Sequence, residues 1–221
     1  MNATFTKQLQ LHNGNPDRRT NDPLRHSRRY ITHMPNLVTQ WLTNNSDVPE
    51  ILAMIHELAA FENATSSVEA TPELLLQTLS FAPSPATLSG RPPSNAPGYA
   101  KTLLLTAHPE NKIAAMALFF TNYSTWRAKP GVYLEDLFVR PAYRRRGFAT
   151  LLLRELARET LRLEPVGGGR LEWACLKWNE NALRFYRSLG AVEMSEWVGL
   201  RVDGERLPAL AQKDVAPKEA S

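Results

Sequence analysis

The chain has 221 residues, of which 43% are hydrophobic and 9% aromatic, so it is long enough for one globular α/β domain with a substantial core. Its single cysteine, Cys175, excludes a disulfide framework and a cysteine zinc cluster. The formal net charge of +4 is carried by residues 1–34, which hold six basic and two acidic side chains. The rest is neutral, so the charge gives no sign of a nucleic-acid partner.

Residues 1–34 are polar, rich in asparagine and arginine, and without hydrophobic periodicity. We expect them to form a disordered or loosely docked basic extension. Pro16, Asp17 and Pro23 would interrupt the amphipathic basic helix of a mitochondrial presequence. No apolar run is long enough to span a bilayer. We therefore expect a cytoplasmic protein without membrane partners, with the mitochondrion or the nucleus as alternatives suggested by the basic tail.

Residues 35–215 are predicted to form a single domain, a mixed sheet flanked by helices. In its first part, periodicity and capping residues predict a strand, two helices and the two strands of a hairpin, at 37–42, 48–61, 71–79, 99–107 and 113–123. The stretch 82–98 contains five prolines and is predicted to be a loop.

In the second part, the pattern predicts a strand at 131–139 and then a helix that opens at the basic turn Arg144–Gly147 and runs to about Leu163. The elements predicted after it are a strand, a short helix closed by a glycine, a last strand pair and a C-terminal helix, at 171–178, 179–189, 193–202 and 205–212.

The basic turn, Arg144-Arg145-Arg146-Gly147, has the features of an anion-binding site, because it leads from a strand into a helix. Free backbone N–H groups and the positive end of the helix dipole converge at such a helix start. Gly147 has no Cβ and lets the backbone approach a bulky anion, for which a pyrophosphate is the natural candidate. The alternative is a plain amphipathic helix whose arginines face the solvent.

This turn resembles the acyl-CoA loop of the GNAT acetyltransferases, R/Q-x-x-G-x-G/A, with Ala149 in place of the commoner last glycine. A second motif, N-x-x-A-x-x-F-Y-x-x-x-G over residues 179–190, resembles the second acyl-CoA signature of that family. Taken alone, the second motif could equally be a helix cap and a packed aromatic pair. The two signatures occur in the family's order, separated by one strand, and together they imply an acetyl-CoA-dependent enzyme without a metal.

The resemblance also implies which residues hold acetyl-CoA. In this family the strand holding Glu135 and the strand holding Trp173 splay apart, and the pantetheine arm bonds to the backbone of the first like an added strand. The residues so assigned to the cofactor are Leu137, Phe138, Val139, Arg144, Arg145, Arg146, Gly147, Phe148, Ala149, Thr150, Asn179 and Ala182. Tyr186 would reach the sulfur and protonate the departing thiolate.

Two further segments narrow the resemblance to the spermidine/spermine N-acetyltransferases. Residues 133–139, Tyr-Leu-Glu-Asp-Leu-Phe-Val, are similar to a strand of those enzymes, and residues 56–62, His-Glu-Leu-Ala-Ala-Phe-Glu, to the end of their first helix. The similarity covers roughly residues 38–202 and implies acetylation of a polyamine or diamine by a homodimer. A cationic amino acid such as thialysine, lysine or ornithine remains an alternative substrate. A non-catalytic acyl-CoA-binding module is the alternative of a different class.

The chemistry of acetyl transfer explains the residue types. An alkyl ammonium group has a pKa of about 10 and must lose a proton before it attacks a thioester. Glu135 is the predicted base, with Asp136 as a second acidic group, although Glu135 could instead only pair with a nearby arginine. The residues expected to bind the amine substrate are Phe61, Glu62, Trp126, Glu135, Asp136 and Glu196, with Trp126 packing against its methylenes or ammonium group.

Other kinds of site find little support. The five histidines are scattered and show no metal-ligand spacing, so no metal is expected. Cys175 has no histidine in either signature to activate it and is predicted to be a core residue of its strand. The arginine run lacks the interleaved aromatics of a nucleic-acid site, so we expect a small amine as the partner and no nucleic acid.

Overall fold

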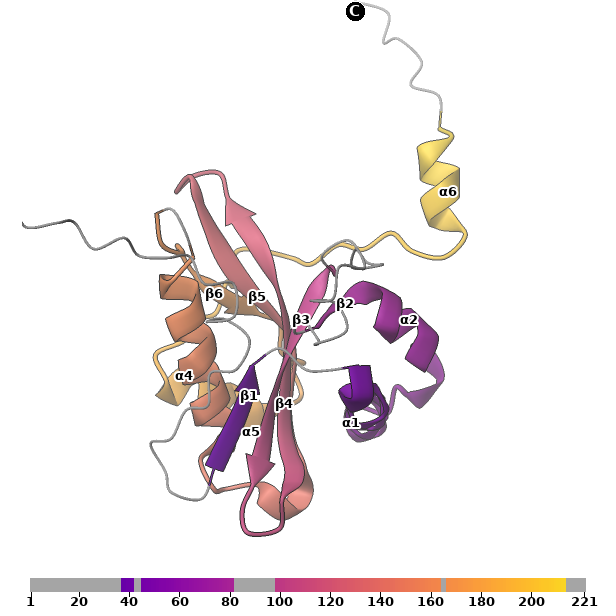
Figure 1. Cartoon of the computed structure of the whole chain (residues 1–221). Helices are drawn as coiled ribbons and strands as arrows, with labels where there is room; N and C mark the ends of the chain where they lie inside the picture. Colours follow the sequence, from indigo (N-terminus) through magenta and orange to yellow (C-terminus); the bar gives the residue numbers. More distant parts are fainter. Residues whose placement is uncertain (1–36, 42–44, 82–97, 164–165, 214–221) are drawn as a thin grey trace, which may run out of the picture. The chain divides into compact units, whose positions relative to one another are not determined.

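The computed structural model describes residues 37–41, 45–81, 98–163 and 166–213 (Figure 1). The chain divides into two compact units, Met1–Ala174 and Cys175–Ser221. The strands of the first unit are β1 Leu37–Trp41, β2 Leu79–Ser80, β3 Ala100–Ala107, β4 Lys112–Ser124, β5 Lys129–Val139 and β6 Leu171–Trp173. Its helices are η2 Asn45–Asp47, α1 Val48–Phe61, η3 Thr65–Ser67, α2 Pro72–Thr78, η4 Pro141–Tyr143 and α4 Phe148–Leu161.

The described strands form one mixed sheet in the order β1-β3-β4-β5-β6, with the short β2 beside β3. The pairs β1–β3, β3–β4 and β4–β5 are antiparallel, whereas β2–β3 and β5–β6 are parallel. This is the mixed α/β architecture that the sequence predicts. The predicted hairpin is also confirmed, since β3 and β4 pair along most of their length.

Helices cover both faces of the sheet in the first unit, with α1 and α2 on one side and α4 on the other (Figure 1). Side chains alternate between the faces along each strand. One face therefore packs against α1 and α2, in a core of Val48, Ile51, Met54, Leu75, Leu79, Leu104, Met116, Leu118 and Phe138. The alternate residues Leu103, Leu105 and Ala117 are also buried, on the face where Leu152 and Leu156 of α4 are fully buried.

The second unit contains two helices, α5 Glu180–Ser188 and α6 Arg206–Ala211, which agree with the predicted ones. The predicted strand pair at 193–202 is wrong, because this stretch holds only a turn at 195–196 and no strand. An alternating apolar pattern forms a strand only where another backbone completes its hydrogen bonds, and none of the described strands pairs with it.

The observed bounds of two elements, one strand and one helix, differ from the predicted ones. The strand predicted at 171–178 is limited to Leu171–Trp173, because its pairing with β5 stops at Leu134 opposite Trp173. The helix predicted to open at the arginines begins only at Phe148, with Gly147 as its N-cap at φ = 80°. Arg144–Arg146 form a turn before the helix, which leaves their amides outside it. None of the described helices is long and apolar enough to cross a membrane.

Candidate active site

A β-bulge at Glu135 interrupts the pairing of β5 with β4. Leu118 lies opposite Asp136 and Phe119 lies opposite Leu134, so Glu135 has no partner residue on β4. A bulge adds one residue to a strand, bends it locally and redirects the neighbouring side chains, and bulges are frequent beside active sites. Here Glu135 is exposed and Asp136 is half-buried, so two adjacent carboxylates lie where the ladder is broken.

The C-terminal end of α1 supplies a third carboxylate. Glu62 is the C-cap of this helix and donates its N–H to Leu58 O at 3.0 Å, and Asn63 then takes a left-handed conformation at φ = 56°. Ala64 N–H closes the end with a bond of 2.8 Å to Ala59 O. These contacts fix the end of α1, where Phe61 is the last helical residue and Glu62 follows it directly.

Glu62, Glu135 and Asp136 form an electrostatically coupled group, here called the acidic cluster. Burial, followed by the effects of the Glu135 and Glu62 carboxylates, raises the pKa of Asp136 to about 6. Burial also raises the pKa of Glu62. No described residue forms an ion pair or hydrogen bond with the side-chain carboxylate of any of the three, so the arginine partner considered for Glu135 is not found there. Such a cluster favours a cation, and Asp136 has a pKa suited to accepting a proton near neutral pH.

Tyr133 extends the same electrostatic environment along β5. Burial raises the pKa of this phenol, followed by the effects of the Glu135 and Glu172 carboxylates. Its ring stacks on Phe120 of β4, with centroids 5.2 Å apart. The Glu172 carboxylate accepts a hydrogen bond from Asn122 Nδ2 at 2.7 Å and pairs with Arg170 Nε at 2.5 Å. It therefore has structural partners, whereas the three carboxylates of the acidic cluster have none among the described residues.

The turn that leads into α4 presents a row of unbonded backbone amides. Within the described residues, the N–H groups of residues 145–150 donate to no carbonyl, and the first bond of the helix runs from Leu151 N–H to Gly147 O at 3.0 Å. Arg145 and Gly147 both have positive φ, 62° and 80°, and no atom lies within 4 Å of where a Gly147 Cβ would be. Successive free N–H groups in a turn with left-handed residues, directly before a helix, form a concave anion site. We call residues 145–150 the anion cradle; they fit a pyrophosphate.

The three arginines of this turn differ in their contacts. Arg146 lies over the Tyr143 ring at 5.1 Å. Arg144 lies over the Phe61 ring at 5.2 Å and donates from Nε to Val139 O at 3.1 Å. Arg145 makes no hydrogen bond, ion pair or ring contact with the described residues, so its charge is available to an anion in the cradle.

Beyond the bulge, one edge of β5 is unpaired. Its antiparallel pairing with β4 continues to Val139, but its parallel pairing with β6 covers only Val132–Leu134. The backbone of Leu137, Phe138 and Val139 therefore faces no described strand on that edge. An extended ligand carrying amides, such as a pantetheine arm, could add there as a strand does.

Trp126 is not brought to the acidic cluster. It lies in the turn between β4 and β5 and is 90% exposed. Glu135 lies six residue steps beyond Lys129, which is roughly 20 Å along the strand. The expected packing of Trp126 against an amine bound at the bulge therefore has no support within this unit.

Four of the predicted site residues, Asn179, Ala182, Tyr186 and Glu196, belong to the second unit. Asn179 is the N-cap of α5, and its Oδ1 accepts the Ala182 N–H at 3.2 Å. Tyr186 packs against Phe185 at 5.3 Å, and its carbonyl accepts the Ala191 N–H at 3.2 Å beyond the helix end. The helix is thus capped at both ends as the motif implies, and the roles of these side chains toward a thioester remain predictions.

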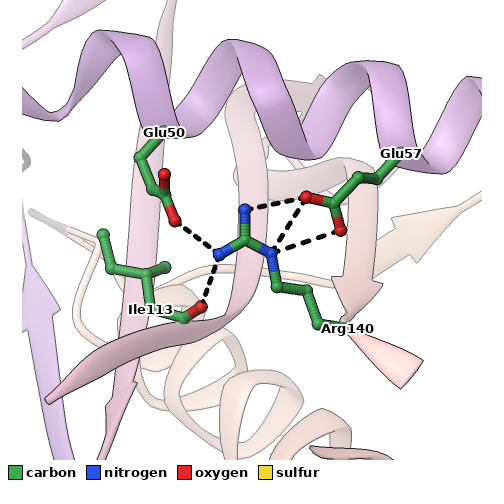
Figure 2. A network of polar contacts seen from close by, with 4 residues as sticks. All are labelled: Glu50, Glu57, Ile113 and Arg140. Atoms are coloured by element: carbon green, nitrogen blue, oxygen red, sulfur yellow. Dashed lines mark hydrogen bonds and ion pairs between the residues drawn. The ribbon is translucent and has the colours of Figure 1, made fainter. Parts of the chain in front are cut away.

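One network was missed by sequence reasoning. Arg140 follows the last residue of β5, and its guanidinium lies between Glu50 and Glu57 of α1 (Figure 2). It makes three bonds to Glu57, at 3.0 and 2.8 Å to Oε1 and at 3.2 Å to Oε2, and it also donates to Glu50 and to Ile113 O. The signal was the seven-residue spacing of Glu50 and Glu57, which places both on one face of the helix. No group of His, Cys, Asp and Glu within the described ranges could hold a metal ion.

Comparisons with known proteins agree with this geometry. Residues 78–191 match the model of the acetyltransferase (GNAT) family. The chain is 34% identical to an L-ornithine N5-acetyltransferase of Arabidopsis thaliana, over 79% of this chain and 88% of the relative. It is 34% identical to a thialysine N-epsilon-acetyltransferase of Caenorhabditis elegans, over 74% and 91%. A human spermidine/spermine N(1)-acetyltransferase-like protein 1 is 27% identical over 76% of this chain and 23% of that protein.

Solved structures support the fold. An integron cassette protein of V.cholerae superposes with a TM-score of 0.60 at 20% identity, over 80% of this chain and 99% of that one. A metagenomic aminoglycoside acetyltransferase in complex with sisomicin gives a TM-score of 0.52 at 18% identity, over 77% and 98%.

Proposed function

The chain belongs to the GNAT family of acetyltransferases, and on that basis we propose that it acetylates the side-chain amine of a small cationic amino acid, such as ornithine or thialysine, with acetyl-CoA as donor. The observation that carries the proposal is the acidic cluster at the bulge of β5, where three carboxylates without ion-pair partners among the described residues adjoin an unpaired strand edge. Relatives of about one-third identity that act on ornithine and thialysine support this substrate class over the polyamine expected from the sequence motifs.

A polyamine or diamine is the second candidate. Its support is the number of carboxylates, because a polycation gains from each additional negative charge along its length. The family relationship to a spermidine/spermine N-acetyltransferase-like protein also supports it. An amino acid carries a carboxylate that three acidic side chains would repel, unless a cation such as an arginine compensates for it.

We assign the proton transfer to the two carboxylates of the bulge. The substrate arrives as an ammonium ion, which the acidic cluster attracts, and it must lose a proton before its nitrogen can attack. Asp136 accepts that proton directly or through a water molecule, since burial and its acidic neighbours raise its pKa to about 6. Glu135, the base expected from the sequence, holds the ammonium and keeps the pKa of Asp136 raised.

The remaining groups position the donor. Acetyl-CoA, when bound, supplies the activated acetyl thioester. The anion cradle would hold its pyrophosphate through the amides of residues 145–150 and the Arg145 side chain, and the backbone of Leu137–Val139 would hold its pantetheine arm. Tyr186 would protonate the thiolate as it leaves; a thiolate of pKa about 8.5 is a fair leaving group, so this acid assists the step.

The test is thiol release from acetyl-CoA with a panel of amines: ornithine, thialysine, lysine, putrescine and spermidine. Turnover with the amino acids at a higher kcat/KM than with the polyamines supports the proposal. Turnover with spermidine alone would keep the same mechanism and favour a polyamine as the substrate. Tight binding of coenzyme A without turnover of any amine would contradict both and favour a non-catalytic acyl-CoA-binding module.

A further inference from the structure

We propose that Arg140 is a positioning residue that couples the amine end of the active site to the anion cradle. It joins α1, whose last residues are Phe61 and the C-cap Glu62, to the segment that leads from β5 into the cradle. The inference rests on the proposed function for the identity of the two ligands, and the structural coupling itself can be measured without turnover.

The Arg140 side chain holds α1 by directional bonds. Its planar guanidinium bonds both oxygens of Glu57 and reaches Glu50 two helical turns away (Figure 2). The Arg140 side chain is 20% exposed and its two carboxylate partners are 37% and 38% exposed, so the guanidinium is partly shielded from water. Arginine is suited to such fixed recognition because its fork of donors matches a carboxylate.

The other contacts of α1 are of a different kind. It packs on the sheet through Val48, Ile51 and Met54, all of them apolar. Apolar packing is non-directional, so it holds a helix against a sheet more firmly than it fixes the helix's position along its own axis. The bonds to Arg140 supply that axial position.

The Arg140 backbone holds the start of the cradle segment at the same time. Its N–H donates to Ala114 O at 3.0 Å, at the point where the β3–β4 register shifts, and its carbonyl accepts the Tyr143 N–H at 2.9 Å. The guanidinium also donates to Ile113 O at 2.9 Å. One residue therefore fixes the end of β5, the start of β4 and the first turn of η4.

A second contact repeats the connection four residues further along both segments. Arg140 binds Glu57, and Arg144 lies over the ring of Phe61 at 5.2 Å. Residues four apart on a helix lie on the same side, so α1 and the segment 140–144 are joined by two consecutive contacts. A shift of the cradle on binding a pyrophosphate is thereby transmitted to Phe61 and to the adjacent Glu62, which belongs to the acidic cluster.

The experiment measures amide hydrogen exchange of the full chain with and without coenzyme A, for the wild type and for Arg140→Met. Methionine keeps an unbranched apolar stem and removes the guanidinium. In the wild type we expect coenzyme A to protect residues 145–150 and also the last turn of α1, where Glu62 and Ala64 donate to Leu58 and Ala59. In Arg140→Met the protection of 145–150 should remain and that of the α1 end should be lost.

Kinetics of the same variants give the second readout. We expect Arg140→Met to raise the KM of the amine about tenfold, while the dissociation constant of coenzyme A changes less than about threefold. Arg140→Lys should recover only part of the loss, because an ammonium group lacks the planar fork of donors that bonds Glu57, Glu50 and Ile113 O together. Glu57→Gln tests the same contact if Arg140→Met folds poorly.

Arg158→Met is the matched control, because Arg158 pairs with the buried Glu155 within α4, which lies on the other side of the sheet from α1 (Figure 1). It should lower thermal stability without changing the KM of the amine. If Arg140→Met lowers stability and leaves the KM unchanged, as the control does, or if coenzyme A does not protect the α1 end in the wild type, the inference is wrong. A wild type that shows the coupled protection but acetylates no amine would contradict the proposed function and leave the coupling standing.

Discussion

The guanidinium of Arg144 lies over the ring of Phe61, 5.2 Å from its centroid, and also 6.0 Å from the centroid of Phe138. The sequence motifs assigned Arg144 to the cofactor and Phe61 to the substrate, and the structure brings the two residues into contact. The turn before α4 and the end of α1 therefore share a boundary, where a change on one side reaches the other.

We expect Arg144→Met to affect both ligands. Loss of a cation–π contact at an exposed site costs about 0.5–1 kcal/mol, so the KM values of the amine and of acetyl-CoA should each rise roughly two- to fivefold. The matched control is Arg146→Met, which removes the contact with Tyr143 in the same turn and should change only the value for acetyl-CoA. Steady-state kinetics with each substrate varied in turn distinguish the two variants.

Asp136→Asn should abolish most of the activity and yet stabilise the fold at neutral pH. The pKa of Asp136 is raised from 3.8 to about 6 by burial and by its acidic neighbours, so the folded state binds its proton more tightly than the unfolded state does. Its contribution to stability is thus full below about pH 4 and is lost as pH rises through about 6. The asparagine variant should be about 1–3 kcal/mol more stable at pH 7, as measured by urea unfolding.

The stability gain of Asp136→Asn should largely disappear at pH 4, where the aspartate is protonated in the folded state and about half protonated in the unfolded state. A variant that is less stable than the wild type at pH 7 would show that the carboxylate makes favourable contacts instead.

The pH dependence of kcat/KM should report the same group. Because Asp136 must be ionised to accept a proton, activity should rise with pH through about 6 in the wild type. Glu135→Gln removes a neighbouring negative charge. It should shift the rise of kcat/KM on the acid side of the profile, the acid limb, to lower pH while retaining part of the activity. A profile that loses its acid limb in Glu135→Gln and keeps it in Asp136→Asn would assign the base to Glu135.

Gly147→Ala should weaken coenzyme A binding. Gly147 stands at φ = 80°, and a left-handed conformation costs an alanine about 1–2 kcal/mol, so the dissociation constant should rise roughly tenfold. No protein atom lies near the added Cβ, so the loss reflects backbone strain and obstruction of the anion. Ala149→Gly is the control: position 149 needs no positive φ, and calorimetry should show less than about a threefold change.

Glu62→Gln should raise the KM of the amine roughly fivefold and leave that of acetyl-CoA unchanged, because a half-exposed carboxylate contributes up to about 1 kcal/mol to binding a cation. Glu69→Gln, an exposed carboxylate beyond η3, is the matched control and should change neither value. An equal effect of the two substitutions would mean that Glu62 attracts the amine only through the long-range electrostatic potential of the protein and not through a local contact.

The parts of the site that depend on local backbone chemistry could be predicted from the sequence. A glycine after a basic turn and before an apolar helix indicates an anion site, and Gly147 is the N-cap of α4, directly after that turn. The helix from Val48 to Phe61 has the predicted bounds, because its periodicity and its start signals agree.

The parts of the site that depend on pairing between distant segments could not be predicted from the sequence. Alternation along β5 gives no sign of the bulge at Glu135, because a bulge is defined by its partner strand. In the sequence, Glu50 and Glu57 look like two charged residues on a solvent-exposed helix face. Their partner, Arg140, follows more than eighty residues later and is brought between them only by the fold. The stretch 193–202 alternates like a strand but has no partner in the described structure.

The unpaired edge of β5 from Glu135 to Val139 has an evolutionary consequence. Main-chain groups are the same in every amino acid except proline, so the acyl donor that we propose to bind there would be retained when side chains along the strand are exchanged. The side chains at the bulge and at the end of α1 are then free to vary with the acceptor. A lineage built on this arrangement can change which amine it modifies, by substitutions at a few positions, without having to rebuild its means of holding the acyl donor.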